Sequence, residues 1–193
     1  MTTTSPEGAT EECTPLPAFA PPARREVKAL AQTLSTLRDG DHASAYLRSK
    51  RYGTHRVVGP LSIHAAHAGL LLVGSPVSTA TQPVGDLLDI TRISDPGAAL
   101  AALPTGVAVP AADLAHGDLV CGHFHLDAYG PFAVLGRAVA LGANSLVLGG
   151  WFLASRGAPG VRLVRAERLA PETVPGLAAL PTPGVADIVV SDR

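Results

Sequence analysis

Short stretches of alternating or continuous hydrophobic residues recur along the chain, and turn-forming residues separate most of them. Alternation with a period of two is typical of a β-strand that buries one face, and a short apolar run between turn residues is typical of a buried strand. The pattern therefore predicts a mainly β protein with four strands in each half. The predicted strands are 43–48, 56–63, 70–73, 87–93, 119–126, 132–141, 146–153 and 161–169.

One segment near the N-terminus has a helical period instead. Its hydrophobic residues lie three or four positions apart, and Gly40 follows, as is common after a helix. The spacing predicts an amphipathic helix over 23–38. The preceding residues, 1–22, include three glutamates, several prolines and no lysine or arginine, which predicts a disordered acidic tail. The apolar positions of the helix are Val27, Leu30, Leu34 and Leu37.

The second half of the chain repeats the first. Six residues recur 77 positions later, and a further six recur 76 positions later, in the same order. Chance matches do not keep order and offset over this length, so the sequence predicts a tandem duplication, with repeat one over 39–115 and repeat two over 116–193. The first six pairs are Gly40/Gly117, Asp41/Asp118, Tyr52/Tyr129, Gly53/Gly130, Val57/Val134 and Gly59/Gly136, and the others are Leu70/Leu146, Leu72/Leu148, Gly74/Gly150, Pro83/Pro159, Leu87/Leu163 and Arg92/Arg168.

A repeat of four or five short strands buries little surface by itself. We expect the two repeats to pack as a pseudo-twofold pair or to close into two adjoining small β-barrels. This layout is similar in outline to SH3-like barrels, a likeness of architecture that implies no function. The repeat also accounts for the apolar stretch 132–154, which has the length of a membrane span. Its counterpart in repeat one contains three histidines and an arginine, so we expect hairpins in both copies and no membrane association.

Composition narrows the setting of the protein. The 193 residues carry a net charge of −1, which gives no bulk attraction to nucleic acid or anionic lipid. Cys13 and Cys121 make no disulfide framework, and the N-terminal segment lacks the basic and apolar regions of a signal peptide. These features predict a cytoplasmic protein.

The predicted strand 119–126 carries the first candidate site. On one face it places mainly apolar residues, and on the other it places Cys121, His123 and His125, followed by Asp127. His-x-His on a strand can hold Zn or Fe, with Asp127 or His116 as a third ligand. Two alternatives stay open: a solvated strand face whose residues drift freely, and a pocket lined by heteroatoms for an organic ligand.

A second candidate site is basic. Arg48, Lys50, Arg51 and Arg56 lie close together in sequence with two tyrosines among them, a composition with which small β-barrels bind single-stranded nucleic acid. The alternative is a solvated strand and turn.

The sequence contains none of the common enzyme motifs, such as a P-loop, a G-x-S-x-G elbow, a C-x-x-C pair or H-E-x-x-H. Trp151 and Phe152 replace a serine and a proline of repeat one, and they either cap the core or form a patch for a partner. We therefore expect a non-enzymatic binding or adaptor protein, in which two homologous β units present a composite surface to a protein partner or to a second copy. The metal site and the nucleic-acid surface are the alternatives.

Overall fold

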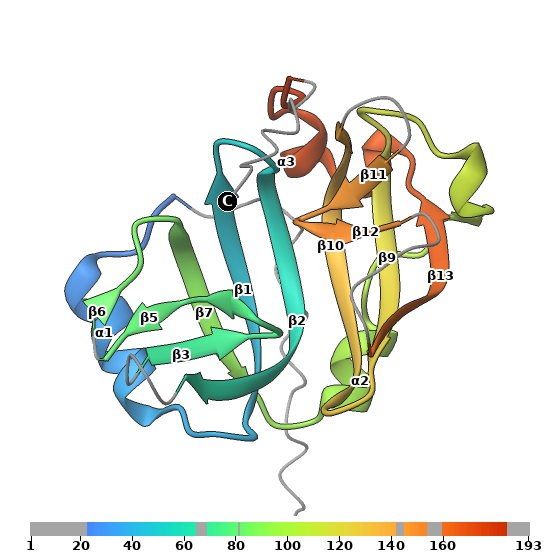
Figure 1. The fold of residues 1–193 in the computed structure, drawn as a ribbon. Helices are drawn as coiled ribbons and strands as arrows, with labels where there is room; N and C mark the ends of the chain where they lie inside the picture. The colour runs from blue at the N-terminus through green and yellow to red at the C-terminus, as the bar shows by residue number, and fades with distance from the viewer. Residues whose placement is uncertain (1–22, 65–68, 81, 142–144, 154–159, 185–193) are drawn as a thin grey trace, which may run out of the picture.

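The computed structural model describes residues 23–64, 69–80, 82–141, 145–153 and 160–184, and β-strands dominate them (Figure 1). The first half holds β1 (His42–Ser49), β2 (Gly53–His64), β3 (Gly69–Leu72), β4 (Ser75–Pro76), β5 (Ser78–Thr79), β6 (Gln82–Pro83) and β7 (Leu87–Ile93). The second half holds β8 (Val107–Ala108), β9 (Leu119–Leu126), β10 (Gly130–Leu141), β11 (Ser145–Leu148), β12 (Trp151–Phe152) and β13 (Val161–Arg168). Helical elements are α1 (Val27–Thr36), α2 (Pro96–Ala101), α3 (Pro175–Ala178) and the 3-10 turns η1 (Ala111–Asp113) and η2 (Pro171–Thr173).

One sheet crosses the whole molecule. In the first half β1 lies between β7 and β2, and in the second half β9 lies between β13 and β10. The long strands β2 and β10 join the halves side by side and antiparallel at the centre (Figure 1). In their register Val57 faces Val134, between the pairs Val58–Ala133 and Arg56–Leu135. The far end of β2 pairs with β3, and the far end of β10 pairs with β11.

The mainly β prediction is confirmed, and its strands fall close to their predicted positions. β7 and β9 have the predicted bounds, whereas the predicted strand 146–153 is two strands, β11 and β12, separated by a turn at Gly149 and Gly150. The barrel form of the prediction is not found, because the described strands form open antiparallel sheets and no closed barrel. None of the helices in the described parts of the chain is long and apolar enough to cross a membrane.

The N-terminal helix is shorter than the predicted 23–38. α1 buries Leu30 and Leu34, but Val27, which the pattern placed on the buried face, is 50% exposed because it opens the helix. The residues before α1 lie against β7 instead, where the Arg25 N–H donates to the Leu88 carbonyl over 2.9 Å.

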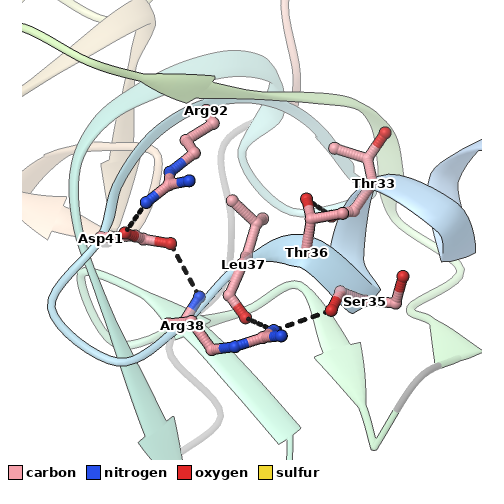
Figure 2. A network of polar contacts seen from close by, with 7 residues as sticks. All are labelled: Thr33, Ser35, Thr36, Leu37, Arg38, Asp41 and Arg92. Atoms are coloured by element: carbon pink, nitrogen blue, oxygen red, sulfur yellow. Dashed lines mark hydrogen bonds and ion pairs between the residues drawn. The ribbon is translucent and has the colours of Figure 1, made fainter.

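Polar side chains end α1 before residue 38. The hydroxyls of Ser35 and Thr36 donate to carbonyls three residues back, so they compete for acceptors of the last turn, and Leu37 already has extended backbone angles. Figure 2 shows the network that follows. Asp41 accepts a hydrogen bond from the Arg38 N–H over 2.8 Å and forms an ion pair with Arg92 over 2.7 Å. This ties the end of the helix segment to the sheet.

The central strands are buried on both faces. One continuous hydrophobic core spans the two halves and includes Leu30, Val57, Phe132 and Val134. A second core lies on the opposite face, and residues of α2 and α3 pack against it (Figure 1). Its buried members are Val58, Leu103, Leu119, Cys121, Ala133, Leu135, Leu169, Val174 and Leu177.

Candidate functional site

Strand β9 alternates as predicted, but its second face is only partly solvated. Val120 and Phe124 belong to the core that spans both halves, whereas Cys121 is fully buried in the second core. His123 and His125 are half-buried, and Asp127 is exposed beyond the end of the strand. The polar face therefore begins at His123 and runs toward the β9–β10 turn.

The predicted metal ligands do not gather at one point. His116 lies before the opposite end of β9, where its Nδ1 accepts a hydrogen bond from the Ala140 N–H over 3.1 Å. Within the part of the chain that the structure describes, no group of three or more His, Cys, Asp or Glu side chains is placed to hold a metal ion. The side chains that do meet His123 are of a different kind.

Two arginines on β13 stand beside the two histidines. The register places Arg165 opposite His123 and Arg162 opposite His125. Arg165 Nη2 lies 3.3 Å from His123 Nε2, and Cys121 Sγ lies 3.5 Å from the same nitrogen. Since a guanidinium only donates hydrogen bonds, Nε2 accepts and the imidazole is neutral in this arrangement.

A buried carboxylate holds Arg165 in place. Glu167 is 5% exposed, and its Oε1 lies 3.0 Å from Arg165 Nε. Its other oxygen accepts a hydrogen bond from the Gly106 N–H over 3.1 Å. The carboxylate thus has a charged partner and a backbone donor, which a buried charge requires.

Electrostatics keep this cluster in a defined protonation state. Burial lowers the pKa of His123, and the charge of Arg165 lowers it further, while Glu167 opposes the shift. Burial, followed by the charge of Glu167, raises the pKa of the Cys121 thiol to about 12. Because a thiolate is the reactive form of cysteine, Cys121 beside His123 is not an activated nucleophile at neutral pH.

The two histidines and the two arginines line a groove of about 440 Å³, a size typical of ligand sites. Arg162 and Arg165 are exposed at its rim, and Arg162 has no ion-pair partner among the described residues. Leu100 comes from α2 in the first half, so both halves contribute to the groove. The lining residues are Leu100, His123, Phe124, His125, Pro131, Phe132, Arg162, Val164 and Arg165.

The predicted basic site is divided by the fold. Arg48, Lys50 and Arg51 are exposed around the β1–β2 turn. Arg56 is 6% exposed, its Nε donates to Ser44 Oγ over 2.7 Å, and its guanidinium lies 5.6 Å from the centre of the Tyr46 ring. Burial lowers its pKa. Arg56 is therefore part of the interior, and a nucleic-acid surface built from the other three cations stays a prediction.

The two aromatic residues of the predicted partner patch have different positions. Trp151 is partly buried and packs against the core, with its ring 5.1 Å from Phe132 and 6.4 Å from Phe124 between ring centres. Phe152 is 40% exposed. Phe152 is therefore the more exposed of the two.

Sequence reasoning did not identify Arg162, Arg165 or Glu167 as site residues. The predicted duplication was the signal that could have found them. It aligns the predicted strand 161–169 with 87–93. Because β7 pairs with β1, β13 is then expected to pair with β9, beside the two histidines.

Comparison with known proteins adds no functional assignment: no family model matches the sequence, no curated protein matches it, and no solved structure matches the fold.

Proposed function

We propose that this chain is a non-enzymatic binding protein, in which two homologous β units share one sheet and the groove beside β9 and β13 receives an anionic ligand. The observation that carries the proposal is the side-by-side placement of Arg162 and Arg165 with His125 and His123 in that groove. Arginine at such positions recognises carboxylate and phosphate groups. Leu100 and Val164 give the ligand apolar contacts.

Matched details support the homology of the two units. The β2–β10 register is unchanged when each residue is exchanged for the one 77 positions away, as a pseudo-twofold axis between Val57 and Val134 would require. Each unit also has an aspartate that accepts a backbone hydrogen bond from three residues back and pairs with an arginine of the last long strand. The two sets are Arg38, Asp41 and Arg92, and Ala115, Asp118 and Arg168.

Binding is favoured over catalysis by the state of the cluster. Cys121 is fully buried and its raised pKa keeps it protonated, while the Nε2 of His123 already faces Arg165 and the thiol. No group in this arrangement is prepared to attack a substrate, whereas the exposed guanidinium groups can hold one.

The test is titration calorimetry with sodium pyrophosphate at low salt. We expect saturable binding that weakens as salt is added and is lost in the variant Arg162→Glu/Arg165→Glu. The matched control is Arg48→Glu/Arg51→Glu, which changes the net charge equally on the exposed β1–β2 turn and should keep the affinity. Equal loss in both variants, or no binding by the wild type, would overturn the proposal.

A further inference from the structure

The outer edge of β7 is covered by another part of the chain. The Arg25 N–H donates to the Leu88 carbonyl over 2.9 Å, and the Arg25 guanidinium forms an ion pair with Asp89 over 2.7 Å. Leu88 is buried. The stretch just before α1 thus docks on this edge with one backbone–backbone hydrogen bond, one ion pair and a hydrogen bond of 3.5 Å from Arg25 Nη1 to the Ile90 carbonyl.

Leu88 is a bulge residue, and the second half has the same bulge. In the first half Tyr46 pairs with Asp89 and the next residue pairs with Leu87, so Leu88 is passed over. In the second half His123 pairs with Arg165, and the next residue pairs with Leu163, so Val164 is passed over. Val164 and Arg165 therefore hold the positions of Leu88 and Asp89.

No described strand pairs with the outer edge of β13 beside this second bulge. β8 pairs with β13 only at Glu167 and Arg168, and the Val109 N–H donates to the Ala166 carbonyl. In the described residues, Val164 pairs with neither neighbouring strand, and it is 61% exposed. The bulge residue is thus buried in the first half, as Leu88, and exposed in the second half, as Val164.

The charge at this edge is reversed between the halves. Asp89, which receives an arginine from the docked stretch, is replaced by Arg165 at the equivalent position. Arg162 adds a second exposed cation two residues before Val164. A segment could dock on β13 in the way that the Arg25 stretch docks on β7. At the position of Arg25, such a segment must carry an acidic residue, because it faces Arg165 where Arg25 faces Asp89.

We infer that the occupant of the groove is an extended acidic segment of a protein partner, which lies along the edge of β13 at Val164. Its backbone N–H donates to the Val164 carbonyl, and its carboxylate pairs with Arg165 and Arg162. Strand edges commonly receive extended peptides in this way, with main-chain hydrogen bonds for affinity and side-chain contacts for specificity. The inference rests on the proposed function and names the ligand class of the same groove.

The probe is a fluorescein-labelled heptapeptide with the sequence of residues 23–29 and the changes Arg24→Glu and Arg25→Glu, and its matched control is the unchanged sequence. Anisotropy is measured with the full chain. We expect the acidic peptide to bind saturably and the unchanged peptide to bind roughly tenfold more weakly or not at all. In the full-chain variant Arg162→Glu/Arg165→Asp this preference should reverse, which a loss of folding could not produce.

The outcomes separate the two proposals. Preference for the acidic peptide with reversal in the variant supports both. If pyrophosphate binds and requires Arg162 and Arg165 but the acidic peptide shows no preference, the peptide inference is wrong and the anion site stands. If neither probe binds, both are wrong. An equal thermal unfolding midpoint for variant and wild type shows that the variant is folded.

Discussion

The two halves of the molecule have matching registers, since β1 pairs with β2 as β9 pairs with β10. They differ in the side chains that these strands carry. Tyr46 and Asp89 of the first half hold the positions of His123 and Arg165 in the second. The turn aspartates, by contrast, keep both their backbone donors and their arginine partners. The turn contacts that fix the path of the chain thus match in the two halves, while side chains at matched positions of the strands differ.

The halves also differ in how their interiors are filled. In the first half, Leu30 and Leu34 of α1 pack into the core beside the sheet. In the second half an aromatic cluster fills the interior, with Trp151 edge-on to Phe132 and the rings of Phe132 and Phe124 stacked at 5.1 Å. Both fillings belong to one continuous core, so we expect the halves to depend on each other for stability.

The largest expected effect comes from truncating a core side chain in each half, which tests whether the two halves depend on each other. Leu30→Ala should lower the free energy of unfolding by about 2–5 kcal/mol and Phe132→Ala by about 3–5 kcal/mol, because both side chains are fully buried. Urea unfolding is followed by Trp151 fluorescence, which reports on the second half, and by far-UV circular dichroism.

We expect a single transition with the same midpoint for both signals, even when the change lies in α1. Val27→Ala is the control on the same helix, and its exposed side chain should contribute less than about 0.5 kcal/mol. A fluorescence transition that stays at its wild-type midpoint in Leu30→Ala would mean that the halves unfold separately.

The next effect concerns the contact between β2 and β10, the strands that join the two halves. A Cβ on Gly59 would lie 2.6 Å from Val73 Cγ2 and 2.7 Å from Phe132 Cβ, and a Cβ on Gly136 would lie 2.9 Å from His55 Cβ. Each glycine thus lets a residue of the opposite half approach closely. We expect Gly59→Ala and Gly136→Ala to destabilise the protein by about 1–3 kcal/mol each, with Gly59→Ala the larger because it has two close contacts.

The matched control is Gly85→Ala, where a Cβ would meet nothing within 4 Å. This variant should be neutral or slightly stabilising, because alanine restricts the unfolded chain. Denaturation midpoints measured side by side decide the matter. Equal midpoints for all three variants would show that β2 and β10 do not meet as closely as described.

The mainly β class of the fold was predictable because its signals are local. Alternation, for example, sets the limits of β9. Gly40, which the pattern placed after the helix, has a positive φ angle. The pattern did not predict the role of Gly59, since the close approach of Phe132 comes from the other half of the chain.

The candidate site was predictable only in part. The pattern identified His123 and His125 as a polar face, but their arginine neighbours depend on the register and bulge of β13, which leave no mark in a single sequence. Two polar residues were misplaced as well. Cys121 and Arg56 alternate onto the polar face of their strands, yet both are buried, Cys121 in the second core and Arg56 beside Ser44 and Tyr46 of β1.

The smallest expected effect is a pH dependence that belongs mainly to one half. His55 is buried beside Gly53, whose carbonyl lies 3.1 Å from its Nδ1, and burial lowers its pKa. Its counterpart in the second half is Phe132, which does not titrate. With a lowered pKa the folded state binds fewer protons than the unfolded state, in which the pKa is about 6.5. Stability from this group is therefore complete above about pH 6.5 and is lost as the pH falls toward the folded pKa.

His123, whose pKa is also lowered, should add to this slope in the same direction. The measurement is the urea midpoint between pH 7.5 and 5, for wild type, His55→Gln and His123→Tyr, the second of which copies the first half. Each variant should flatten the slope, and His55→Gln should flatten it more because His55 is the more deeply buried. If the urea midpoint of His55→Gln depended on pH as steeply as that of the wild type, the imidazole of His55 would have the same pKa in the folded and unfolded states. Burial of a histidine where the second half has Phe132 would then have no consequence for the pH dependence of stability.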